Sequence, residues 1–146
     1  MRKIRRIYET TQEICFVSPQ KEFSLYWNSF KKSELGRIYD AVPWNDLTKG
    51  LKIREHRKGP NKIFSPQGML ALMFLKSYVG CSDRKLIGHL NGNIDFQMFC
   101  GIFLGPDRIN NYKIVSEIRC QLARHLDIKI LQQVLAESWK PYLTGT

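Results

Sequence analysis

The sequence predicts an all-α protein on three observations. Apolar residues recur at helical spacing in several segments, serine residues stand just before those segments, and no segment shows the strict alternation of a half-buried strand. The 146 residues, 43% of them hydrophobic, are enough to bury one core. We therefore expect a small domain of about six short to medium helices over residues 33–143, preceded by a loosely ordered basic arm over residues 1–32.

The N-terminal part of the chain carries the weakest structural signals. Residues 1–32 mix basic and aromatic side chains and show neither clean helical nor strand periodicity, which assigns them to an arm that is expected to pack in part on the domain. Ser33 stands where it can cap a helix that ends at Pro43. A second short helix, starting at Pro43, is expected to turn Trp44 and Leu47 inward.

The middle of the chain carries the clearest helix signals. Residues 66–79 are apolar almost all round, with Ser65 as a start signal and Gly80 as a stop signal, and they predict the central core helix. Ser82 is placed to cap a short helix that follows. The Asn-Gly pair at 91–92 is expected to end that helix in a left-handed turn.

Three further helices are predicted towards the C-terminus. Asp95 is expected to cap a short one, and Asn110 or Asn111 a long one. The long helix has an apolar stripe of Ile114, Val115, Ile118 and Leu122 and an opposite face of Lys113, Glu117, Gln121 and Arg124. A turn at Gly105 and Pro106 precedes it, and a last helix is expected over about residues 127–139.

The net charge of +10 indicates a polyanionic partner. Residues 1–62 hold fourteen Lys or Arg against seven acids, whereas residues 63–146 hold nine against six. The longest apolar run, Met69–Leu75, falls far short of the roughly 20 residues that span a bilayer. We therefore expect a soluble cytoplasmic, nucleoid-associated protein with no membrane partner.

Residues 81–101 concentrate side chains that could bind a metal or act as nucleophiles, namely Cys81, Asp83, His89, Asp95 and Cys100. Their spacing fits no common zinc site, and both aspartates stand where helices begin and can cap them. No Cys-x-x-Cys pair or glycine-rich phosphate loop occurs. Free buried thiols are favoured for all four cysteines, Cys15, Cys81, Cys100 and Cys120, and helix caps for the two aspartates. No metal, cofactor or catalytic residue is therefore predicted, although thirteen acids leave a paired-carboxylate magnesium site open.

Two groups of residues are predicted to contact DNA. The basic loop supplies Lys49, Lys52, Arg54, Arg57, Lys58 and Lys62 for phosphate contacts, together with the basic residues Arg2–Arg6 of the arm. Residues 82–90 and 110–126 form a candidate divergent helix-turn-helix, although their separation is much longer than the usual turn. Its second helix offers Asn111, Tyr112, Lys113, Ser116 and Arg119 to the major groove, and Lys113, Arg119 and Arg124 are also candidates for phosphate contacts.

Four segments of the chain carry a family resemblance. They are SELGRIYDAVPWNDL (33–47), the run from Phe64 to Ile102, NYKIVSEIR (111–119) and LAESWKPYL (135–143). Together they resemble the N-terminal domain of bacterial insertion-sequence transposases of the DDE class. The resemblance implies a DNA-binding and assembly module ahead of an RNase H-like catalytic domain, where three acidic residues hold two divalent metal ions, Mg²⁺ by expectation.

The resemblance also implies that the catalytic domain would begin beyond Thr146. The chain is therefore expected to be a truncated, catalytically inert transposase domain, either a split or decayed reading frame or a bounded domain. Its expected partner is double-stranded DNA at the terminal repeats of the element. The other expected partner is a second copy of this chain or an intact transposase.

The rival hypothesis is a protein-interaction module that dimerises transposase subunits without contacting DNA. Aromatic residues of the arm, Tyr26 and Trp27 among them, favour it. Nuclease activity of the isolated chain is a third and weaker alternative.

Overall fold

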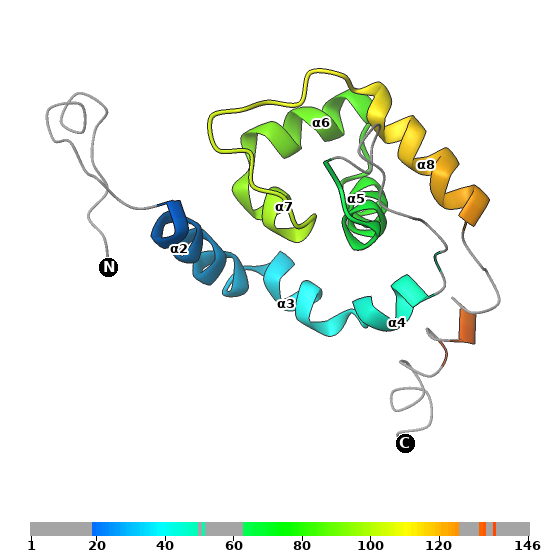
Figure 1. Cartoon of the computed structure of the whole chain (residues 1–146), viewed down its shortest axis with the longest axis horizontal. Helices are drawn as coiled ribbons and strands as arrows, with labels where there is room; N and C mark the ends of the chain where they lie inside the picture. Colours follow the sequence, from blue (N-terminus) through cyan, green and yellow to red (C-terminus); the bar gives the residue numbers. More distant parts are fainter. Residues whose placement is uncertain (1–18, 50, 52–62, 126–131, 134–135, 137–146) are drawn as a thin grey trace, which may run out of the picture.

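The computed structural model describes residues 19–49, 51, 63–125, 132–133 and 136, and it is all-helical over these residues, without a β-strand. The helices are α2 (Pro19–Lys31), α3 (Glu34–Ala41), α4 (Trp44–Lys49), α5 (Pro66–Val79), α6 (Asp83–Gly92), α7 (Ile94–Phe99) and α8 (Lys113–His125). Helix α5 contacts α4, α6, α7 and α8, whereas α2 and α3 pack on α7 (Figure 1). The predicted all-α class is confirmed.

Three serine caps begin helices where the sequence predicts them. The side-chain oxygens of Ser33, Ser65 and Ser82 accept hydrogen bonds from backbone N–H groups in the first turns of α3, α5 and α6. Each cap satisfies one of the N–H groups that a helix start leaves without an intrahelical partner. Gly80 ends α5 with φ of 68°, a left-handed conformation that favours glycine.

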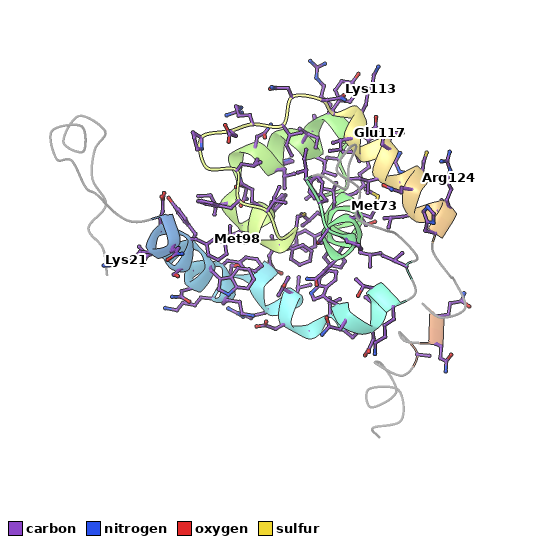
Figure 2. The ribbon with its side chains drawn as sticks, in the orientation of Figure 1. Lys21, Met73, Met98, Lys113, Glu117 and Arg124 are labelled. Atoms are coloured by element: carbon purple, nitrogen blue, oxygen red, sulfur yellow. The ribbon has the colours of Figure 1, made fainter. Side chains whose placement is uncertain are left out.

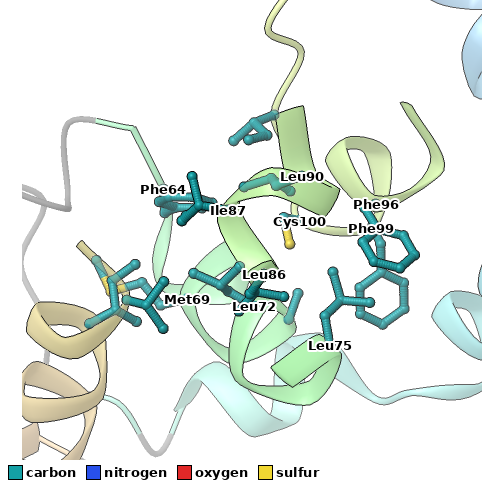
Figure 3. Close-up of a cluster of buried hydrophobic side chains, with 14 of the residues drawn as sticks. Phe64, Met69, Leu72, Leu75, Leu86, Ile87, Leu90, Phe96, Phe99 and Cys100 are labelled. Atoms are coloured by element: carbon teal, nitrogen blue, oxygen red, sulfur yellow. The ribbon is translucent and has the colours of Figure 1, made fainter. Parts of the chain in front are cut away.

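The core is built around α5, as its apolar composition predicts. Met69, Leu72 and Leu75 of α5 are fully buried and belong to the same cluster as Leu86 and Leu90 of α6 (Figure 3). Helix α7 contributes Phe96, Met98 and Phe99, and the predicted stripe of α8, Ile114, Val115, Ile118 and Leu122, is buried. One cluster therefore joins α5, α6, α7 and α8, which determines how α8 is held.

The loose order predicted for the arm is wrong for residues 19–31, which form α2, whereas the expected partial packing of the arm on the domain is confirmed for this segment. Phe30 is fully buried, and Trp27 and Phe30 each lie against the ring of Tyr39 in α3, at centroid distances of 5.6 and 5.7 Å. The aromatic residues Phe23, Tyr26, Trp27 and Phe30 follow the i, i+3, i+4, i+7 pattern of a helix face. Packing of this stripe onto α3 and α7 orders the segment, and residues 1–18 lie outside the described part.

Two predicted details between α6 and α7 are also wrong. No left-handed turn occurs at Asn91 and Gly92, since α6 continues through Gly92 and Asn93 is extended, with φ of −133°. Asn93, rather than Asp95, caps α7, because its side-chain oxygen accepts from the N–H groups of Asp95 and Phe96. Asp95 instead lies in the first turn, where a negative charge still favours the helix dipole.

The C-terminal prediction is only partly covered by the structure. Gln132, Gln133 and Ala136 are helical, and the rest of the helix predicted over residues 127–139 lies outside the described residues. The turn predicted at Gly105 and Pro106 is confirmed, with Gly105 at φ of 59°.

Candidate nucleic-acid interface

Two amide side chains hold the segment that leads to α8. Gln97 of α7 is buried, donates to the carbonyl of Leu90 at 2.9 Å and accepts from the N–H of Leu104 at 3.1 Å. Asn91 of α6 donates to the carbonyl of Ile109 at 2.9 Å and accepts from its N–H at 2.8 Å. Helix α6 therefore anchors the segment that ends four residues before α8.

Asn111 has a structural role at the start of α8. Its side-chain oxygen accepts from the N–H of Lys113 at 3.1 Å, in agreement with a cap at one of the two predicted asparagines. Tyr112, Lys113 and Ser116 follow and are exposed. One lone pair of the Asn111 oxygen is thus engaged, while its amide N–H₂ group can still donate to a ligand.

The outer face of α8 carries positive charge. Lys113 and Arg124 are exposed on the outer side of the helix, with Glu117 between them (Figure 2). Neither cation forms an ion pair with another described residue. Gln121 was predicted to lie on the exposed face of the helix, but it is half-buried and its Oε1 atom is fully enclosed.

Arg119 differs from the other cations of α8 because it has an acidic partner on α6. Its Nη2 atom lies 2.8 Å from Oδ1 of Asp83, and Nζ of Lys76 in α5 lies 2.6 Å from the same oxygen. The hydrogen bond from Lys76 is the largest cause that holds the pKa of Asp83 below its ordinary value, and the hydrogen bond and charge of Arg119 lower it further, against the opposing effect of desolvation. Asp83 thus links α5, α6 and α8 at one point.

These contacts predict an acid-sensitive contribution to stability. The pKa of Asp83 in the folded protein lies below its ordinary value of 3.8. The contribution of the ionised carboxylate to the free energy of unfolding is therefore fully present above this ordinary value, and it is lost as pH falls through the folded-state pKa. We expect Asp83→Asn to lower the free energy of unfolding by about 1 kcal/mol at neutral pH, the upper end for partly exposed pairs. Its loss of stability on acidification should be smaller than in the wild-type chain.

Urea unfolding at neutral and at acidic pH measures both effects. Asp107→Asn is the matched control, because Asp107 is exposed and its carboxylate has no partner among the described residues. An identical pH dependence in Asp83→Asn and the wild-type chain would contradict the assigned role.

The predicted basic loop is described only at its first residue. Lys49 is exposed in the last turn of α4 and lies 3.3 Å from the carboxylate of Asp46. Lys52, Arg54, Arg57, Lys58 and Lys62 lie outside the described residues. The structure therefore groups Asn111, Lys113, Arg119 and Arg124 on or beside one helix, and it places Lys49 on another.

Within residues 63–125, three exposed basic residues were not predicted as contacts. Arg84 and Lys85 directly follow Asp83 on α6, and Arg108 lies in the segment that Asn91 anchors before α8. Residues 63–125 hold seven Lys or Arg against four acids. Arg84 and Lys85 lie near the candidate interface because α6 packs on α8. The sequence signal that could have identified them is their position in the first helical turn after the Ser82 cap.

The two helices of the candidate helix-turn-helix contact each other. Helix α6 packs directly on α8, and the hydrogen bonds of Asn91 and Asp83 connect the two ends of α6 to the α8 region. The connection between them spans residues 93–112 and includes α7. This arrangement differs from a helix pair joined by a turn of 3 to 4 residues.

The cysteine, histidine and aspartate cluster does not form a metal site in the described part of the chain, where no group of three or more such ligands occurs. Cys100 is buried, and desolvation raises the pKa of its thiol, which makes it a poor nucleophile. The described cysteines are free thiols. The expectation that the thiols are buried is wrong for Cys120, which is exposed because it lies opposite the apolar stripe of α8.

A second surface combines α2 with the segment after α7. Phe23 and Phe103 are 40% and 38% exposed, with ring centroids 6.0 Å apart, and Tyr26 lies 5.8 Å from Phe103. Tyr26 and Phe103 also line a hollow of about 530 Å³, together with Glu22, Asn91, Ile94 and Gln97 among others. This aromatic surface is an exposed apolar feature of α2 and the segment after α7.

Comparison with known proteins identifies one similarity. A family model described as "Transposase domain (DUF772)" matches residues 25–121, from within α2 to within α8. No curated protein and no solved structure gives a match. Over the described residues, no helix is both long and apolar enough to cross a membrane.

Proposed function

The chain belongs to the transposase domain (DUF772) family, and from this premise we propose that it binds double-stranded DNA at the ends of an insertion element during transposition. The observation that carries the proposal is the exposed pair Lys113 and Arg124 on α8, which form no ion pair with another described residue. Unpaired cations on one helix attract phosphates, and the net charge of +10 adds to the attraction.

The arrangement of α8 suits a helix that enters the major groove. Asn111, Tyr112, Lys113 and Ser116 lie at or beside its N-terminal turn, the part of a recognition helix that contacts base edges. Arg124 lies near the other end and would contact a phosphate. The side-chain amides of Asn91 and Gln97 form hydrogen bonds that hold the segment leading into α8. Binding therefore does not require a large loss of conformational entropy in this segment.

The cations of α8 can be tested through the salt dependence of binding. We expect Lys113→Ala combined with Arg124→Ala to reduce the slope of log K against log salt by about two and to weaken affinity for duplex DNA about 50-fold at 0.1 M salt. Fluorescence anisotropy with a labelled duplex, from 50 mM to 300 mM salt (about the range in which such slopes are measured), gives both values.

A matched double variant separates local contacts from overall charge. Lys32→Ala with Arg37→Ala removes the same charge from exposed positions beside and on α3, which lies away from α8 (Figure 1). This variant should keep most of the wild-type slope. Equal losses in the two double variants would show that binding responds to net charge alone.

A second candidate function is subunit dimerisation without DNA contact, and the exposed rings of Phe23 and Phe103 favour it. Of the aromatic residues named from the sequence, Trp27 supports it less, since its ring packs on Phe30 and Tyr39. Light scattering beside a mobility-shift assay distinguishes the two functions. A dimer that is indifferent to DNA supports dimerisation, whereas a monomer that shifts DNA excludes it.

A further inference from the structure

Arg119 of α8 forms an ion pair with Asp83 of α6, which distinguishes it from a cation that only attracts phosphates. Arg119 is 36 residues away from Asp83 in the chain, yet its Nη2 atom lies 2.8 Å from Oδ1 of Asp83. The Arg119 side chain keeps 48% of its surface exposed, while that of Asp83 keeps 26%. The carboxylate therefore holds the guanidinium group and leaves a large part of it open.

A carboxylate at this distance makes Arg119 a poor phosphate ligand. Its negative charge lies beside the guanidinium group and offsets the attraction for a second anion. Lys76 also contacts Oδ1 of Asp83 at 2.6 Å, which keeps the carboxylate in place as the partner of Arg119. The guanidinium group of Arg119 is planar and rigid. Once Asp83 holds one of its N–H groups, the remaining N–H groups therefore point in fixed directions.

From this geometry, and resting on the DNA binding proposed above, we propose that Arg119 reads a guanine in the major groove and that Asp83 is the residue that positions it. Guanine presents two acceptors there, N7 and O6, which match two parallel N–H donors of an arginine. Adenine presents an N6 amino donor in place of O6 and would oppose Arg119. The pair would therefore contribute base preference, whereas Lys113 and Arg124 would contribute affinity.

The test begins with the full chain and a randomised duplex library, from which the preferred site is selected and then varied one base pair at a time. At one guanine, replacement by adenine should weaken wild-type binding by about 5- to 150-fold. The base analogue 7-deazaguanine, which lacks N7, should weaken binding at the same position. Arg119→Ala should lose both effects at that position and keep the preferences at all others.

The positioning role of Asp83 requires a separate variant. Asp83→Asn keeps Arg119 but removes the charge that orients it, so preference for that guanine should fall while affinity for random duplex stays equal or rises. Arg124→Ala is the matched control, because it removes an arginine of the same helix that has no acidic partner among the described residues. It should lower affinity for all duplexes alike.

Each contrary result has a distinct meaning. A uniform loss across all duplexes in Arg119→Ala would make Arg119 a phosphate contact and overturn the guanine assignment. An unchanged guanine preference in Asp83→Asn would overturn the positioning role. Absence of duplex binding by the wild-type chain at low salt would overturn the proposed function itself, and this inference with it.

Discussion

Replacement of Lys52, Arg54, Arg57 and Lys58 by serine in one variant is expected to weaken binding to duplex DNA about 10³-fold at 0.1 M salt. Each cation that contacts a phosphate releases close to one condensed counterion, so four of them should also reduce the salt slope by about 3 to 4. The segment from Lys49 to Lys62 carries six cations and a single acid, Glu55. The expectation rests on this charge density, and anisotropy titrations at several salt concentrations measure it.

The matched control keeps the charge and changes the residue types. Lys52→Arg, Arg54→Lys, Arg57→Lys and Lys58→Arg, combined in one variant, retain all four cations and should retain the slope. If the serine variant keeps the wild-type affinity and slope, the loop makes no phosphate contacts. Positive charge on α8 would then have to account for binding by itself.

Gly36→Ala is expected to destabilise the fold by at least about 3 kcal/mol, the upper range for overpacking. A methyl group at Gly36 of α3 would meet the main-chain carbonyl of Phe30 and would lie 2.8 Å from Cα of Lys31. Backbone atoms at the junction of α2 and α3 cannot rotate away as a side chain can. Relief of the clash would separate the helices and withdraw Phe30, which is fully buried, from the core.

Gly88→Ala provides a control with the same chemical change. Gly88 lies in α6, and a methyl group there would have nothing within 4 Å. Since alanine is favoured over glycine in a helix by roughly 1 kcal/mol, this variant should be as stable as the wild-type chain or slightly more stable. Thermal and urea unfolding compare the two, and equal stabilities would show that α2 does not pack on α3 as described.

Local sequence signals predicted the helix starts well. Ser33, Ser65 and Ser82 each bond a backbone N–H within three residues, so the sequence alone contains both partners. The same locality explains the stop at Gly80 and the apolar stripe of α8. Helix α2 was missed because its stripe, from Phe23 to Phe30, was assessed together with the mixed basic and aromatic residues that precede it within residues 1–32.

The local rules failed where a side chain had a competing distant partner. Asn91 was predicted to end α6, but its side-chain amide forms hydrogen bonds with the backbone of Ile109, which is eighteen residues further on. Asp83 stood where a first-turn carboxylate could serve the helix start, yet it also bonds Lys76 and Arg119. Each of these side chains connects elements whose proximity depends on the packing of α5, α6 and α8.

The sequence by itself determined the all-α class, the capped starts of three helices, the central position of α5 and the family resemblance that the match over residues 25–121 supports in part. The tertiary structure alone decided which cations have acidic partners. Arg119 has one and Lys113 and Arg124 have none among the described residues. The physical reason is that capping and periodicity act over one helical turn, whereas an ion pair between helices exists only after the core has brought them together.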